Sequence, residues 1–469
     1  MADQGPIDLA TRPGMARDDT RGEAVNKLLA YHHSPDCYSA PFAEVRDLQI
    51  AAMNERLQTR IDTIKLVALR AKQANLTEIR DFADAVPLLL PHTAYKSYPE
   101  SFLLEQKWDK LTKWLGTVST YPVDDTDLDG IADVDDWIGR LEQAGHYVSC
   151  SSGTTGKSAM LIASKADMDW TGEDSVQACA WGTGIRPAQD RYTFSMAPIA
   201  AVPRNLTILG SLHHAYGRPD SERFRYPVPP ITVGSITRMI ALRKAVAEGT
   251  AMPAEIAEYE STAAAREKAL DDAIGITVEA LLKVRGEKLY LTGMWGNLYK
   301  VAAVMRERGL SGKDFHPENL MYVGGGLKRE QLPDDYREFV CETFAIAPEH
   351  NFQIYGMQEL GSVAPRCTKG GRYHLPPWLI CLPLNKEADA LLPMDQGEIQ
   401  CRAGLFDLSM DGRWGGVISG DRIEVDFGPC ACGAATPSIR DTIVRYADLE
   451  GDDKIGCAGT IDAYVRGLS

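Results

Sequence analysis

The sequence predicts an α/β protein built from layered sheets and helices. Apolar residues recur three and four positions apart over residues 47–73, which is typical of an amphipathic helix. Residues 288–295, 319–327 and 351–362 each begin as an apolar strand and continue into a glycine-containing loop, as strands of a layered α/β protein do. The strand-like residues 397–403 and 416–427 add sheet toward the C-terminus.

Helical patterning before residue 87 predicts a helical extension ahead of the main α/β domain. Residues 234–285 are rich in Ala, Glu and Arg, and they predict one or two surface helices.

Composition excludes several classes of protein. Of the 469 residues, 25% are charged and 44% hydrophobic, as in ordinary globular proteins. The formal net charge of −15 argues against a protein that grips nucleic-acid phosphates. No apolar run approaches the ~18 residues of a membrane span, and the N-terminus lacks a signal-peptide core, so we expect no membrane contact. Ten scattered cysteines indicate a reducing compartment, and we expect the cytoplasm.

The segment SSGTTGKS lies between a short strand, HYVSC, and a second apolar segment, AMLIAS. Its glycines let several backbone N–H groups converge on one point, and its hydroxyls and lysine add donors and positive charge, which suits a polyphosphate. A polar hairpin turn is one alternative, and the P-loop of a phosphotransferase is another, although a P-loop begins with Gly where this segment has Ser. The candidate phosphate-binding residues are Ser151, Ser152, Gly153, Thr154, Thr155, Gly156 and Lys157.

Three later groups suit the rest of a nucleotide. Tyr355, which precedes Gly356 in NFQIYGMQE, offers a flat apolar face to a base. Glu359 can hold Mg²⁺ beside phosphates. Asp421, in the tripeptide SGD, can accept two hydrogen bonds from a ribose diol. A core tyrosine, a surface glutamate and a turn aspartate are the alternative interpretations.

In this order, the segments resemble those of the adenylate-forming superfamily, which includes the acyl-CoA synthetases. SSGTTGKS is similar to the family's phosphate loop, with Ser158 in place of a proline, and YGMQE is similar to its Y-G-x-T-E. The resemblance implies that Gly325 and Gly326, in GGGL, form a turn beside the adenine. It also implies a large layered domain with a small β-barrel over residues 85–440, in which 234–285 would be a helical insertion. An N-terminal arm with helices over 1–84 would precede this domain, and a short final segment over 441–469 would follow it. The cofactors that the resemblance implies are ATP and Mg²⁺, and the catalytic residues are Lys157 and Glu359.

Within that superfamily, the chain is similar to the phenylacetate–CoA ligase and coenzyme F390 synthetase branch. The likeness lies in GPCACG, which contains Cys430 and Cys432, and in the pair Cys367 and His374. Three thiols and one imidazole make a ligand set suited to a closed structural Zn²⁺ site. Reduced thiols without a metal are the alternative.

The resemblance also implies a hinge that contains Arg440 and Arg445. The family has an arginine there that contacts the ribose, and we expect Arg440 to be that residue. Beyond the hinge, the family continues into a mobile small domain with a catalytic lysine, and residues 441–469 would be a stub of it. Three explanations stay open. A separate partner protein takes the place of that domain, the chain activates acids with help from Lys157 alone, or it has lost full turnover.

The activity that the resemblance implies is activation of a carboxylic acid with ATP, which releases pyrophosphate and forms an acyl-adenylate. The acyl group then passes to a thiol of CoA, a carrier protein or a protein cysteine. Transfer to an amine and a non-catalytic nucleotide-binding scaffold are alternative functions, and P-loop phosphotransfer is a further one. The sequence specifies neither the acid nor the acceptor.

Two further patterns have open interpretations. The acidic residues 125–136 are similar to a calcium loop, but we favour an acidic loop that caps a helix over 134–141. A basic group that contains two histidines either meets a carboxylate substrate or is a surface patch. Its members are Arg204, His213, His214, Arg223 and Arg225.

Overall fold

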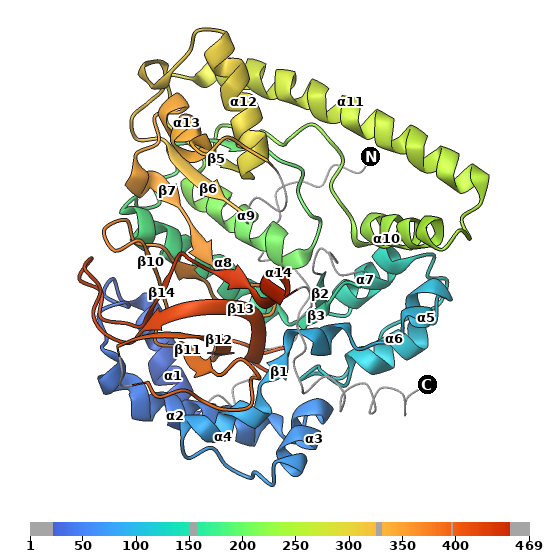
Figure 1. Ribbon diagram of the computed structural model, residues 1–469, viewed down its shortest axis with the longest axis vertical. Coiled ribbons are helices and arrows are strands. Elements are labelled where there is room, and N and C mark those ends of the chain that lie inside the picture. The colour runs from blue at the N-terminus through green and yellow to red at the C-terminus, as the bar shows by residue number, and fades with distance from the viewer. Residues whose placement is uncertain (1–21, 151–156, 325–330, 395–396, 451–469) are drawn as a thin grey trace. The chain divides into compact units, whose positions relative to one another are not determined.

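The chain divides into two compact units, each of which contains sheets and helices (Figure 1). The predicted α/β class is therefore confirmed. The described part of the first unit is 175–324 with 331–353, and that of the second is 22–150, 157–174, 354–394 and 397–450. Helix α8, Lys165–Thr183, begins in the second unit and ends in the first. The computed structural model describes residues 22–150, 157–324, 331–394 and 397–450.

A parallel sheet with the order β4-β5-β6-β7 forms the centre of the first unit. Parallel neighbours need long crossover connections, and helices supply them here. The strands expected from 288–295, 319–327 and 351–362 are β5, β6 and β7. The strands are Tyr192–Ser195 (β4), Leu289–Gly293 (β5), Leu320–Val323 (β6) and Asn351–Phe352 (β7). The helices are Pro203–Tyr216 (α9), Val233–Ala247 (α10), Pro253–Val284 (α11), Trp295–Glu307 (α12) and Tyr336–Thr343 (α13), with short 3₁₀ turns at Gly312–Asp314 and Pro348–His350.

One face of this sheet carries the apolar core of the first unit. Phe194, Leu291 and Met321 point to this face and pack in one cluster with residues of α11, α12 and α13. Strand side chains alternate between faces, so the intervening residues point the other way. Helices α10 and α11 occupy the stretch 234–285, and its status as an insertion stays a prediction.

In the second unit, the predicted N-terminal helices pack against strands from the C-terminal part of the chain. Gln49 on α2 donates a hydrogen bond of 2.8 Å to the Pro377 carbonyl, and Arg56 Nε donates one of 3.2 Å to the Leu408 carbonyl. These helices and their short companions are Glu23–Ala30 (α1), Tyr31–His33 (η2), Phe42–Arg60 (α2), Lys65–Gln73 (α3), Phe82–Ala85 (α4), Val86–Leu88 (η3), His92–Lys96 (η4), Glu100–Leu104 (α5) and Trp108–Leu115 (α6).

A mixed sheet with the path β10-β14-β13-β12-β11 forms the second unit's largest sheet, and β1 and β15 also pair with β13. The sheet corrects the expected β-barrel: among the described strands, β10 and β11 end the path without pairing with each other. The strands are Leu90–Pro91 (β1), Arg372–His374 (β10), Leu379–Leu384 (β11), Glu398–Asp407 (β12), Gly416–Asp426 (β13), Ser438–Arg440 (β14) and Val444–Arg445 (β15), and helix Tyr446–Glu450 (α14) follows them.

Two small hairpins complete the second unit. Tyr147–Cys150 (β2) pairs antiparallel with Met160–Ala163 (β3), and Ile354–Tyr355 (β8) pairs antiparallel with Ala364–Pro365 (β9). The expected helix after the acidic loop is Val134–Gln143 (α7), and the Asp133 side chain accepts hydrogen bonds from two N–H groups of its first turn. The helix-capping interpretation is thus confirmed.

The proposed domain limits at 84 and 440 stay a prediction, and residues 451–469 lie outside the described residues. In the part of the chain that the structure describes, none of the helices is both long and apolar enough to cross a bilayer.

A buried histidine makes the stability of the second unit depend on pH. His32 lies among Trp170 and Trp378, with ring centroids 4.6 and 5.4 Å away, and burial lowers its pKa from 6.5 to about 4. The unfolded chain therefore binds a proton between pH 6.5 and 4 that the folded chain excludes. Unfolding free energy should fall by up to about 3 kcal/mol as pH drops through that window.

Chemical denaturation at a series of pH values measures this loss. His32→Gln should flatten the slope of unfolding free energy against pH between 6.5 and 4, whereas His214→Gln, at an exposed position, should leave it unchanged. An equal slope in His32→Gln and the parent would contradict the assignment.

Candidate active site and candidate metal centre

The candidate phosphate loop connects the two strands of the β2–β3 hairpin. Residues 151–156, which hold most of its predicted phosphate ligands, lie outside the described residues. Lys157 and Ser158 are described, and strand β3 follows them directly. A P-loop instead leads from a strand into the N-terminus of a helix, whose N–H groups help to hold phosphate. The antiparallel hairpin therefore overturns the P-loop alternative.

Tyr98 anchors the end of this loop. Its hydroxyl donates a hydrogen bond of 2.8 Å to the Ser158 carbonyl, and Lys157 Nζ lies 4.3 Å from the centroid of its ring. A cation over an aromatic ring at this distance is attracted by the ring's quadrupole. Burial raises the pKa of Tyr98 above its ordinary value, so the ring stays neutral and its hydroxyl stays a donor. The sequence analysis missed Tyr98, because it lies 59 residues before Lys157.

Tyr355 and Asp421, predicted to hold a base and a ribose, lie in contact. The Tyr355 hydroxyl donates a hydrogen bond of 3.1 Å to Asp421 Oδ2, and the Ser419 hydroxyl donates one of 2.8 Å to the same oxygen. Burial and the Asp421 charge raise the pKa of Tyr355 well above its ordinary value, which keeps it a donor.

Arg445 lies beside that same carboxylate. Strand β15 pairs with β13 so that Arg445 is opposite Asp421, and Arg445 Nε is 3.8 Å from Asp421 Oδ1. Arg440, which we expected near the ribose, instead lies on β14, 2.6 Å from Glu398 and 3.4 Å from Glu424. Of these two arginines, Arg445 is thus the one that lies beside Asp421, and the expected ribose role of Arg440 stays a prediction.

The loop that carries Glu359 is held on both sides by buried charged groups. Arg413 donates hydrogen bonds to the Gln358 carbonyl, at 3.0 Å, and to the Ile162 carbonyl of β3, at 2.6 Å. Downstream of Glu359, the Asp407 carboxylate accepts hydrogen bonds from the Gly361 and Ser362 N–H groups, at 2.9 and 2.8 Å. Buried charged groups that bond to the backbone on both sides of a loop restrict the conformations open to it.

Lys96 is a second residue that the sequence analysis missed. Burial lowers its pKa, while the charge of Glu359 opposes that shift and the charge of Arg445 adds to it. Lys96 therefore lies close to the predicted magnesium ligand and to the arginine beside Asp421. No motif pointed to it, because η4 is separated from each of these segments by more than 260 residues.

The predicted adenine turn can be placed only in part. Gly325 and Gly326 lie outside the described residues. Gly324 directly follows β6 in the first unit, where its N–H donates a hydrogen bond of 3.0 Å to the Gly293 carbonyl. Gly356 directly follows β8 in the second unit.

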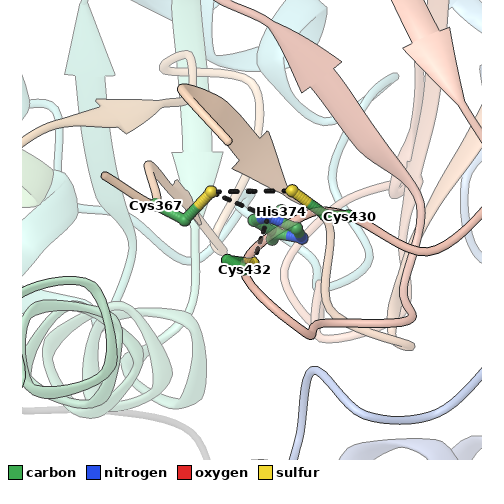
Figure 2. Close-up of side chains that lie close together, drawn as sticks. All are labelled: Cys367, His374, Cys430 and Cys432. Carbon is green, nitrogen blue, oxygen red and sulfur yellow. Dashed lines mark hydrogen bonds between the residues drawn. The ribbon is translucent and has the colours of Figure 1, made fainter. Parts of the chain in front are cut away.

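The predicted metal ligands converge at one point in the second unit (Figure 2). Their candidate ligand atoms all lie within 4.8 Å of one another. Cys367 Sγ is 3.8 Å from Cys430 Sγ and 3.3 Å from His374 Nε2, which is in turn 3.4 Å from Cys432 Sγ. Tetrahedral zinc with Zn–S bonds of ~2.3 Å separates its sulfur ligands by about 3.8 Å. The spacing therefore fits a single zinc ion.

Backbone turns place these thiols. The Cys430 N–H donates to the Ala434 carbonyl at 2.8 Å, and the Ala434 N–H donates to Cys432 Sγ at 3.5 Å. Gly433 has a φ of +99°, a conformation that side chains rarely adopt. A Cβ on Gly370 would collide with Cys430 Sγ. Burial raises the pKa of Cys367, but hydrogen bonds from His374 and from the backbone outweigh burial and lower it to about 6, which favours the thiolate that metals bind.

Comparison with known proteins identifies the fold. No family model matches the chain, and no curated protein matches it in sequence. A crystal structure of 2-hydroxyisobutyryl-CoA ligase in the postadenylation state, in complex with R3-HIB-AMP, has a TM-score of 0.53 and 12% identity, covering 88% of this chain and 70% of that one. An open conformation of the same ligase with 2-HIB-AMP and CoA has a TM-score of 0.53 and 11% identity, covering 89% and 74%.

The chain has the adenylate-forming ligase fold. The fold that the resemblance implied is thus confirmed, apart from the barrel. Identities of 11% and 12% establish the fold alone, so the placement in the phenylacetate–CoA ligase branch stays a prediction.

Metal analysis tests the candidate metal centre. Protein purified without chelator should contain about one zinc per chain, and Cys430→Ser and Gly370→Val should each lower this to well below half, because one removes a ligand and the other displaces it. Cys341→Ser, at a thiol in the first unit, is the control and should keep its zinc. Less than half an equivalent of zinc in the parent chain would contradict the assignment.

Proposed function

We propose that this chain activates a carboxylic acid with ATP to form an acyl-adenylate and pyrophosphate, and then transfers the acyl group to a thiol. The fold supports this proposal, because the ligase structures that share it were solved with acyl-adenylates and, in one case, CoA. The observation that carries it is the contact of Tyr355 with Asp421, with Arg445 beside them.

In this proposal, the Asp421 carboxylate accepts hydrogen bonds from the ribose hydroxyls while its contacts with Tyr355 and Ser419 hold it in place. Arg445 adds a positive charge beside the same sugar. The Tyr355 ring would contact the adenine. Together these groups fix the α-phosphate relative to the incoming acid, which is how positioning lowers the barrier of a displacement.

Several positively charged and hydrogen-bonding groups would hold the phosphates of ATP. The hydroxyls and N–H groups of 151–156, with Lys157, would hold the β- and γ-phosphates, and Lys96 is a further cation near Glu359. Mg²⁺, when bound, would supply positive charge that offsets the charge of the phosphates. Glu359 would hold that ion, and Arg413 and Asp407 keep its loop in position.

The acceptor we favour is a thiol, of CoA, a carrier protein or a protein cysteine, because the neighbouring structure with CoA is a ligase to that thiol. Transfer to an amine and a non-catalytic nucleotide-binding role are the alternatives. The Cys₃His group would hold a structural zinc that joins the β9–β10 segment to the one between β13 and β14, since four protein ligands leave no position for substrate.

Product analysis tests the proposed activity. The chain incubated with ATP, Mg²⁺ and a library of carboxylic acids should release pyrophosphate and AMP with at least one acid when a thiol acceptor is present. Glu359→Ala should slow pyrophosphate release by about 100-fold or more, the scale for removing one electrostatic contact to a transition state. Glu105→Ala, at an exposed position, is the control.

Unchanged pyrophosphate release in Glu359→Ala would reject its magnesium role. Binding of ATP without release for any acid would favour the non-catalytic alternative. ADP in place of AMP would exclude adenylate formation.

A pair of arginine variants tests the ribose site. Arg445→Ala should raise the KM for ATP by about 10-fold or more, because a charge-assisted hydrogen bond contributes about 1.5–3 kcal/mol. Arg440→Ala should change it less than about twofold, since its guanidinium pairs with Glu398 and Glu424. The opposite order of the two effects would return the role to Arg440.

A further inference from the structure

The face of the first unit's sheet opposite its apolar core is unusually polar. Ser195, Tyr290 and Thr292 alternate with core residues along β4 and β5 and are buried, with 2%, 0% and 3% of their surfaces exposed. Parallel sheets are normally apolar on both faces. Helix α9 covers this face, because its His213 and Tyr216 rings lie 6.0 and 5.5 Å from the ring of Tyr290.

A short segment around Phe224 extends the sheet beyond β4. The Phe224 N–H donates to the Thr193 carbonyl, and the Ser195 N–H donates to the Phe224 carbonyl, both at 2.9 Å. Phe224 stacks on Phe194 at the apolar face, with ring centroids 5.1 Å apart. Since strand side chains alternate, its neighbours Arg223 and Arg225 are directed to the polar face.

Arg223 makes one side-chain contact there. Its Nε and Nη2 atoms donate hydrogen bonds of 3.2 and 2.8 Å to the Ser195 hydroxyl. Over the described residues, no carboxylate lies within ion-pair distance of the Arg223 guanidinium. Burial and the charge of Arg225 lower the pKa of Arg223 to about 9, so it is still positive at neutral pH. A partly buried cation without a counter-ion is costly.

His213 adds a second unusual group. It is 8% exposed, and within the described ranges neither ring nitrogen has a hydrogen-bond partner. Buried polar atoms almost always have one, and leaving one unpaired costs about 1–3 kcal/mol. Burial and the charges of Arg223 and Arg225 lower the pKa of His213 well below its ordinary value, so the ring is neutral and offers one N–H donor beside two cations.

We propose that Ser195, His213, Arg223 and Arg225, named here the basic cluster, bind an oxyanion, a carboxylate or a phosphate, either free or at the end of a larger ligand. Two guanidinium groups, a hydroxyl and an imidazole N–H are the donors that such an anion needs. Arg225 is exposed and Arg223 partly exposed, so a ligand can reach them from solvent. The anion would supply the charge that Arg223 lacks and a partner for His213. This site is independent of the proposed acyl-adenylate activity.

Calorimetry on the full chain at constant ionic strength tests this proposal. The probes are inorganic phosphate, n-butyl phosphate and succinate, with chloride as the background ion. At least one should bind, and Arg223→Gln, which can still bond Ser195, should weaken its Kd by about 10-fold or more, as loss of a charged hydrogen bond predicts. His213→Phe should also weaken it. Tighter binding of the ester or succinate than of phosphate would indicate a larger ligand.

Two controls make the result specific. Arg218→Gln removes an arginine of the same unit that already pairs with Asp220, and it should bind as the parent does. Lys157→Ala alters the candidate ATP loop in the other unit and should also leave this binding unchanged. Absence of binding by all three probes, or an equal loss in Arg218→Gln or Lys157→Ala, would overturn the proposal.

Discussion

Strand β13 is the element on which the rest of the second unit depends, because it pairs with four other strands. Its register with β15 places Asp421 opposite Arg445, and its register with β14 sets Ser438 opposite Asp426. Ser438 is paired in turn with His374, a candidate metal ligand. A shift of one residue would turn every side chain of the strand to the opposite face. The same backbone pairing therefore places both the candidate nucleotide site and the candidate metal centre.

The candidate active site is held mainly by buried hydrogen bonds rather than by apolar packing. Asp407 accepts bonds from Ser409 as well as from the loop after Glu359, and Arg413 bridges the other side of that loop to β3. Carboxylates and guanidinium groups that are removed from water are costly unless they are hydrogen-bonded. This requirement leaves few conformations open to the loop that carries Glu359. A site that positions two reactants for a displacement needs such a restriction.

The candidate metal centre illustrates a different constraint. Cys367 precedes the turn that leads into β10 and His374 ends that strand, while Cys430 and Cys432 lie between β13 and β14 (Figure 2). Zinc ligation at this point would join two segments that the sheet already brings near each other, so it would add stiffness more than it would create the fold. In the first unit, by contrast, the polar face of the sheet under α9 holds the Arg223 guanidinium, which bonds to the Ser195 hydroxyl.

Short contiguous motifs were predictable from sequence alone. The Tyr355 and Asp421 segments and the Cys and His spacing each indicate a chemistry locally, although the roles of these residues stay predictions. The apolar period and the segment lengths were enough to predict the helices and strands of an α/β fold. Pairing between distant segments was not predictable. The position of Arg445 opposite Asp421, the contacts of Tyr98, and the absence of pairing between β10 and β11 among the described strands depend on strand register and on which buried group finds which partner. Those are properties of residues hundreds of positions apart, so only the tertiary structure decided them.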